Sequence, residues 1–103
     1  MPKETRVARV GDVPPGQMKL VEVGGEPVVL ANVDGQVYAF SDECTHQACP
    51  LSEGDLKSDV VECGCHGSQF NVRTGAVVSG PARRPVKSYA VRVQQQDIFV
   101  GEG

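Results

Sequence analysis

Apolar and polar residues alternate in short stretches along most of the chain, which is the period of a half-buried β-strand. Turn-forming residues separate these stretches, and Asp34-Gly35 is the strongest hairpin signal among them. The pattern predicts strands over residues 4–10, 18–23, 27–33, 36–40, 59–62, 69–72, 76–79, 86–93 and 98–100. A series of short strands of this kind indicates an all-β fold, either an antiparallel sandwich or a barrel.

Two stretches carry further expectations. The alternation from Val86 to Val93 is unbroken, so one continuous strand is expected there. The segment between Phe40 and Asp59 has few apolar residues, so we expect it to contribute little to the core and to need another source of order.

Composition and charge agree with a small β domain. The chain has 103 residues, which allows one domain, and its eighteen Val against four Leu and one Ile favour strands over helices. A net charge of −3 argues against binding to nucleic acid or an anionic membrane, which would need a basic face. Neither a membrane-spanning run nor the apolar stretch of a secretory signal is present. We therefore expect a cytoplasmic protein, monomeric, without nucleic-acid or membrane partners.

All four Cys and both His lie in two short windows, residues 44–49 and 63–66. The spacing is Cys-x-His, sixteen residues, then Cys-x-x-His. Three interpretations are open: a structural zinc site, side chains that bind no metal, or an iron–sulfur centre to which each loop gives one Cys and one His. Zinc fingers usually pair Cys with Cys and His with His, so the mixed spacing argues against zinc. Two His, each at a fixed spacing from a Cys, argue against side chains that bind no metal.

The two windows resemble the cluster-binding loops of the Rieske [2Fe–2S] family. The segment Cys44-Thr45-His46-Gln47-Ala48-Cys49 is similar to the first loop, and Cys63-Gly64-Cys65-His66-Gly67-Ser68 to the second. Further similar positions are Phe70, Thr74-Gly75, Gly80-Pro81-Ala82 and the strands around Tyr89. The resemblance implies one domain over residues 1–103: an antiparallel β-sandwich with a small subdomain of two cluster-binding loops, about 41–54 and 63–68, and a proline loop, about 80–85.

The resemblance also implies the ligands of a single [2Fe–2S] cluster. Cys44 and Cys63 would bind one iron, and His46 and His66 the other. Replacing two thiolates by neutral imidazoles changes the formal charge of the oxidised centre from about −2 to about 0, which eases reduction. Rieske potentials accordingly run from roughly −150 to +300 mV, against about −400 mV for plant-type four-Cys clusters.

Other residues are assigned by the same resemblance. Cys49 and Cys65 stand where high-potential members carry a disulfide between the loops; closing about seventeen residues would stabilise the fold by roughly 3 kcal/mol. Two free thiols are the alternative, and the default in a reducing cytosol. Ser68 would donate a hydrogen bond to a cluster sulfide, which raises the potential. Phe70 stands where high-potential members carry a Tyr, and the loss of that hydroxyl lowers the potential. An intermediate reduction potential is therefore expected. Pro81 would cover the cluster.

A cluster that moves one electron, in a chain without a G-x-G-x-x-G or phosphate-loop motif, points to an electron carrier and not an enzyme. The resemblance to soluble Rieske-type ferredoxins implies transfer from a flavin-dependent reductase to a terminal oxygenase. Two alternatives remain: a small redox or regulatory subunit of a larger oxidoreductase such as a nitrite-reductase-type assembly, and a zinc-stabilised interaction domain.

We expect partner proteins to dock at the tip of the cluster loops. The residues expected to surround the His edges there are Gln47, Pro50, Leu51, Gly67 and Pro81. Acidic residues near the first loop would steer a basic partner, although charge runs are more often simply solvated. These residues are Asp42, Glu43, Glu53 and Asp55.

Overall fold

The computed structural model describes residues 4–43, 49–64, 67–80 and 82–101, and nearly all of its regular structure is β. The strands are β1 (Glu4–Arg9), β2 (Met18–Val23), β3 (Glu26–Val33), β4 (Gln36–Ser41), β5 (Asp55–Lys57), β6 (Val60–Glu62), β7 (Gln69–Asn71), β8 (Val77–Ser79), β9 (Ser88–Tyr89), β10 (Val91–Gln94) and β11 (Asp97–Gly101). Two short 3₁₀ turns, η1 (Val10–Asp12) and η2 (Leu51–Glu53), complete the described elements. The predicted all-β, antiparallel fold is confirmed. Among the described residues, no helix has the length and apolar character needed to cross a membrane.

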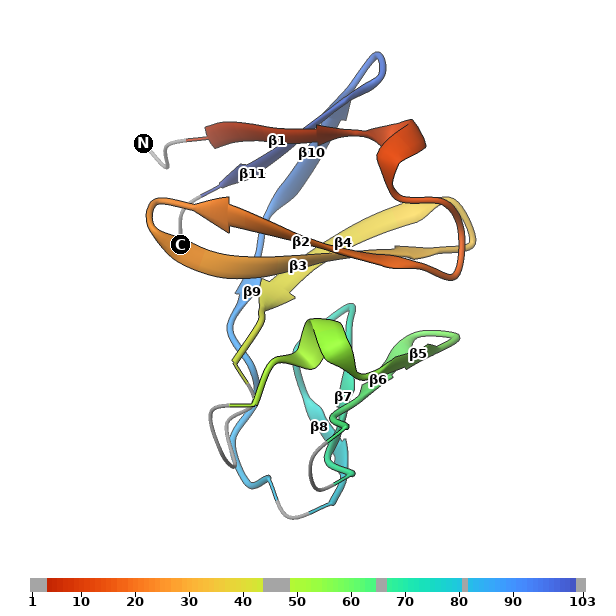
Figure 1. Ribbon diagram of the computed structural model, residues 1–103, viewed down its shortest axis with the longest axis vertical. Helices are drawn as coiled ribbons and strands as arrows, with labels where there is room; N and C mark the ends of the chain where they lie inside the picture. The colour runs from red at the N-terminus through yellow and green to blue at the C-terminus, as the bar shows by residue number, and fades with distance from the viewer. Residues whose placement is uncertain (1–3, 44–48, 65–66, 81, 102–103) are drawn as a thin grey trace.

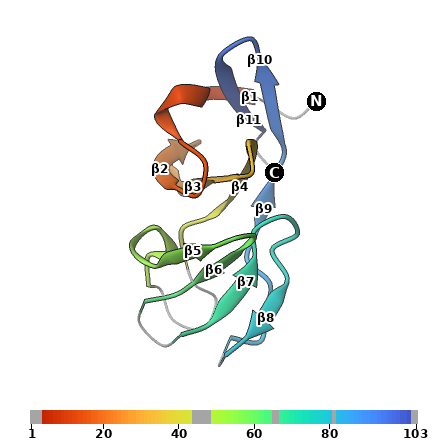
Figure 2. The same ribbon diagram turned by 90° about the vertical axis from the view of Figure 1, so that its right-hand side faces the viewer.

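The strands form three antiparallel sheets that follow one another along the longest axis of the molecule (Figure 1). The strand orders are β1-β11-β10, β2-β3-β4-β9 and β5-β6-β7-β8. Figure 2 shows the β5–β8 sheet at the end opposite the β10–β11 hairpin. The overall extents are 38 × 28 × 18 Å. The middle sheet therefore separates the upper sheet from the one that carries the second Cys/His window.

Strand β3 is buried on both of its faces, and its side chains contribute to two cores. Val28 and Leu30 pack in the core shared with Ile98 on β11, on the side of the upper sheet. Val29 and the alternate residues after it pack in the core that contains Phe70 and Cys63, on the side of the lower sheet. Burial from Val28 to Val33 is therefore continuous, because this strand is covered on both sides.

The hairpin predicted at Asp34-Gly35 is confirmed: β3 and β4 pair in register, and both turn residues have positive φ, 53° and 92°. The predicted single strand over 86–93 is wrong. β9 pairs with β4, whereas β10 pairs with β11, so the chain changes sheets at Ala90. A strand over Asp55–Lys57, absent from the prediction, pairs with β6.

The expectation that residues between Phe40 and Asp59 contribute little to the core is also wrong for one residue. Leu51 is fully buried and packs in the same core as Phe40 and Phe70. Leu56 packs partly buried against that core. This segment therefore has apolar anchors of its own.

Candidate metal centre

The second Cys/His window begins at the end of β6, where the backbone makes a tight turn. Cys63 is 2% exposed, and its thiol is free. The Cys63 N–H donates to the Ser68 carbonyl oxygen at 2.8 Å, and the Gly67 N–H donates to the Cys63 carbonyl oxygen at 3.1 Å. Gly67 has φ +76°, a conformation that glycine adopts at little cost. The turn closes the second loop at its base and returns the chain into β7.

The first loop is also closed at its base. Glu43 and Pro50 form an isolated antiparallel bridge. The Leu51 N–H donates to the Asp42 carbonyl oxygen at 2.7 Å, and the Ser52 N–H donates to Asp42 Oδ1 at 2.7 Å. Asp42 is thus a buried residue that holds the start of η2. Of the four acidic residues expected to steer a partner, Asp42 is buried, whereas Glu43, Glu53 and Asp55 are exposed.

Leu51 was expected to lie at the docking tip, and this prediction is wrong. Its side chain is 0% exposed because η2 turns it into the core. Pro50 and Gly67 of the expected tip are exposed. Gln47 and Pro81 lie outside the described residues.

The segment after β8 packs against the second loop. Ser68 is fully buried, and its Oγ accepts a hydrogen bond from the Ala82 N–H at 3.2 Å. Gly80 lies against the same serine, since a Cβ built on Gly80 would stand 2.6 Å from Ser68 Cα. The described residues on both sides of Pro81 are therefore next to the second loop, where the sequence predicted the proline loop.

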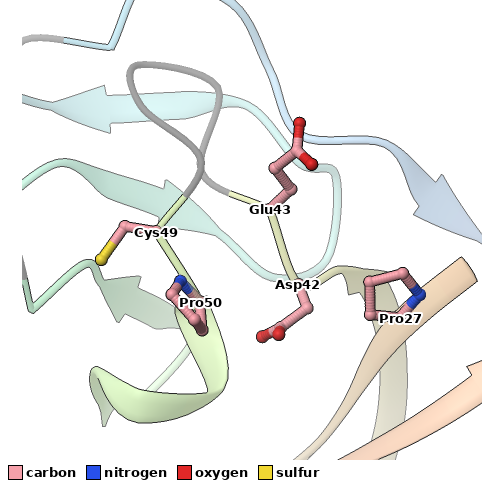
Figure 3. A pocket seen from close by; sticks show the side chains of 5 residues that line it. All are labelled: Pro27, Asp42, Glu43, Cys49 and Pro50. Carbon is pink, nitrogen blue, oxygen red and sulfur yellow. The ribbon is translucent and has the colours of Figure 1, made fainter.

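The two Cys/His loops meet around Cys49. A pocket of about 290 Å³ is lined by Cys49, Pro50, Glu53 and Gly64, which joins the end of the first loop to the second. A smaller pocket of about 170 Å³ is lined by Pro27, Asp42, Glu43, Cys49 and Pro50 (Figure 3). There the Cys49 sulfur and the Glu43 carboxylate point in opposite directions.

Four of the predicted site residues lie in the described part of the chain: Cys49, Cys63, Ser68 and Phe70. Cys49 is disulfide-bonded, whereas Cys63 is a free thiol. This donor chemistry fits the predicted roles, because a free thiol can ligate a metal and a disulfide sulfur is already committed. Phe70 is fully buried beside Cys63 in one core. The remaining predicted residues, Cys44, His46, Cys65, His66 and Pro81, lie outside the described residues, so the pairing of Cys49 with Cys65 stays a prediction.

A charged contact flanks the base of the second loop. Lys57 Nζ lies 2.9 Å from Glu62 Oε1, and Gln69 Nε2 donates to Glu62 Oε2 at 3.1 Å. The hydrogen bond from Lys57, followed by the one from Gln69, holds the pKa of Glu62 below its usual 4.5. The same contact raises the pKa of Lys57 above 10.5. Glu62 directly precedes Cys63, and Gln69 directly follows Ser68. The contact between them therefore joins β6 and β7, the two strands that carry the loop.

Sequence analysis named Gly80 only as part of the expected proline loop, and it did not single out Gly54. Gly54, after η2, lies against the backbone on both sides of Cys63, and Gly80 lies against Ser68. Glycines in loops are the usual signal of turns, and their contacts with a distant loop leave no pattern in the sequence.

Comparisons with known proteins agree with this arrangement. Residues 3–90 match the model of the Rieske [2Fe–2S] domain. The chain is 41% identical to the ferredoxin component of biphenyl 2,3-dioxygenase from Rhodococcus jostii RHA1, covering 93% of this chain and 90% of that protein. It is 43% identical to the biphenyl dioxygenase ferredoxin subunit of Pseudomonas sp. KKS102, with coverage of 93% and 89%.

A solved structure gives the same result. The structure is the complex of reduced oxygenase and oxidised ferredoxin of carbazole 1,9a-dioxygenase. The fold superposes on one of its chains with a TM-score of 0.90 at 38% sequence identity. The match covers 95% of this chain and 92% of that one. The relatives are ferredoxin components, which confirms the expected class, an electron-transfer protein and not an enzyme. The family model matches most of the chain, and the curated relatives match over nearly its whole length. The chain therefore belongs to the Rieske [2Fe–2S] domain family.

Proposed function

We propose that this protein is a one-electron carrier that receives electrons from a flavin-dependent reductase and delivers them to a terminal oxygenase. The observation that carries the proposal is the similarity over nearly the whole chain to ferredoxin components of dioxygenase systems. The free, buried Cys63 at the base of the second loop supports it, because a thiol in that place is available for ligation. The cytoplasmic location expected from the sequence is part of the proposal.

We assign the ligands residue by residue. The thiolates of Cys44 and Cys63 would hold one iron, and the imidazoles of His46 and His66 the other. When bound, a Rieske [2Fe–2S] cluster takes up and releases one electron. The chain's own contribution is to keep the Cys63 backbone in a fixed turn, to bury its side chain, and to hold the second loop against the segment around Ala82. A site fixed in this way needs little rearrangement when its charge changes.

Spectroscopy of the purified protein tests the cofactor. We expect a red-brown protein whose dithionite-reduced form gives a rhombic EPR signal, with an average g value below that of a four-Cys cluster. A colourless protein that contains one zinc after iron-replete anaerobic preparation would contradict the proposal. It would instead favour the alternative of a zinc-stabilised interaction domain.

Purification and turnover test the partners. A purified reductase and oxygenase of the biphenyl dioxygenase type should support substrate turnover only when this protein is added. The alternative, a small subunit of a nitrite-reductase-type assembly, predicts stable co-purification with a large catalytic subunit. The ferredoxin components among its relatives favour the carrier.

A further inference from the structure

Gly54 lies directly against the backbone of the second loop. A Cβ built on Gly54 would overlap the Glu62 carbonyl oxygen and would stand 3.3 Å from the Gly64 nitrogen. These two atoms belong to the residues immediately before and after Cys63. Both neighbours are backbone atoms, so they cannot move aside as a flexible side chain does. Any residue larger than glycine would therefore displace the backbone that carries Cys63.

The position of Gly54 is itself fixed from the core. Its N–H donates to the Leu51 carbonyl oxygen at 3.0 Å, and Leu51 is fully buried. One residue further on, Asp55 pairs with Glu62 in the β5–β6 ladder. Because its bond to the buried Leu51 fixes Gly54, a side chain at position 54 would displace the backbone of the second loop and not Gly54 itself.

Gly80 makes a comparable contact with the other end of the loop. A Cβ on Gly80 would stand 2.6 Å from Ser68 Cα and 3.1 Å from both the Gly67 oxygen and the Ser68 nitrogen. Its φ of +99° also disfavours any side chain. Gly54 and Gly80 come from different segments of the chain, and they contact the loop at Cys63 and at Ser68, respectively.

We propose that Gly54 and Gly80 are positioning residues of the electron-transfer centre, which hold the two ends of the second loop in the geometry that its metal ligands require. The inference rests on the proposed function, since it concerns how the carrier holds its cluster. Neither glycine has a side chain that could ligate a metal; each would act through the backbone of residues 62–64 or 67–68. Displacing either end would alter the orientation of the Cys63 thiolate, and with it the potential and the retention of iron.

The test compares Gly54→Ala and Gly80→Ala with variants that add the same methyl group where no atom lies within 4 Å. Gly11→Ala is the control for Gly54, because both have ordinary φ values. Gly35→Ala is the control for Gly80: its φ is +92°, so it carries the same left-handed strain without the contact. Iron release to a chelator, the reduction potential and the EPR g values are measured on each folded, iron-loaded protein.

We expect both test variants to bind iron about 10- to 100-fold more weakly than the wild type, as mutations in the shell around metal ligands commonly do, and therefore to release it faster to the chelator. Their potentials and g values should differ from the wild type, whereas those of both controls should not. Equal iron release, potential and g values in the test variants and controls would overturn the inference. A wild-type protein that binds no cluster would instead refute the proposed function, so the two failures are distinguishable.

A measurement on the wild type covers the case in which a test variant does not fold. Gly64 and Gly67 are exposed, yet the proposed contacts would hold this backbone still. Hydrogen exchange of the iron-loaded protein, read by mass spectrometry, should show protection of the Cys63 and Gly67 N–H groups, which donate hydrogen bonds within the loop, at the level of β6 and β7. Exchange there at the rate of the exposed turn at residues 94–96 would overturn the inference.

Discussion

The backbone N–H of Ala82 donates a hydrogen bond to Ser68 Oγ across 3.2 Å, and both residues are buried. A serine hydroxyl can accept two hydrogen bonds and donate one. The bond from Ala82 uses an acceptor position, so the hydroxyl proton remains for another acceptor. The predicted role of Ser68, donation to a cluster sulfide, is compatible with this geometry.

Replacing Ser68 by alanine should lower the reduction potential, because the reduced and more negative cluster would lose a hydrogen-bond donor. It should also destabilise the protein by about 1–3 kcal/mol, because the buried Ala82 N–H would lose its acceptor. Protein-film voltammetry and thermal unfolding measure the two effects. Ser88→Ala, at an exposed position on β9, is the control and should change neither. A wild-type potential in Ser68→Ala would refute the role of the hydroxyl.

Leu51 should be important for stability and not for docking. Leu51→Ala removes a fully buried side chain, and we expect the free energy of unfolding to fall by about 2–5 kcal/mol. Leu20→Ala is the matched control, because Leu20 is 51% exposed, and its effect should stay within about 0.5 kcal/mol. Chemical denaturation followed by circular dichroism measures both. Similar losses in the two variants would show that Leu51 is not part of the core in solution.

The disulfide prediction is tested by alkylation without reductant. After the protein is unfolded and its iron removed, Cys44 and Cys63 should be modified, whereas Cys49 and Cys65 should react only after reduction. Peptide mass spectrometry identifies each modified cysteine. Breaking the bond by Cys49→Ser should lower stability by roughly 3 kcal/mol in the chain-entropy model. Modification of Cys49 and Cys65 before reduction would contradict the predicted pairing.

The contact between Lys57 and Glu62 predicts a pH-dependent stability. Because the pKa of Glu62 is lowered in the fold, its contribution is present above the usual value of 4.5 and is lost as the pH falls through the lower, folded value. The pKa of Lys57 is raised, so its share is present below 10.5 and is lost only at more alkaline pH. The contribution is therefore complete at neutral pH.

Melting temperatures of the wild type and Lys57→Met measure this effect. The wild type should be more stable at pH 7, and the difference should narrow as the pH falls below 4.5. Added salt should reduce the difference at pH 7, since the pair is at the surface. Lys19→Met, at an exposed position on β2, serves as the control. A difference independent of both pH and salt would show that the charge pairing of Lys57 with Glu62 does not account for it.

The sequence predicted most strands because alternation reports which residues face a core. It did not predict which sheet each strand joins. Ser88–Tyr89 and Val91–Gln94 continue one alternating pattern, yet they pair with β4 and β11, respectively. Nothing in a period of two residues marks the change of sheet at Ala90.

The part of the candidate site that could be predicted is the set of Cys and His residues, because their spacing along the chain is a motif. The Cys and His positions indicated the family directly. The burial of Leu51 was not predictable, because a single apolar residue between Pro50 and Ser52 forms no periodic pattern of apolar and polar positions. The hydrogen bonds of Asp42 and the contacts of Gly54 depend on segments that become neighbours only in the folded chain.

The burial of β3 on both faces has a consequence for how the molecule unfolds. Val28 and Leu30 belong to the core beneath the upper sheet, and Val29 belongs to the core that contains Cys63. A strand common to both cores thermodynamically couples the end with the cysteines to the remote end. The proposed cluster-binding loops therefore should not melt as a separate unit, and heating the iron-loaded protein should produce one cooperative transition in which the cluster and the far sheet are lost together.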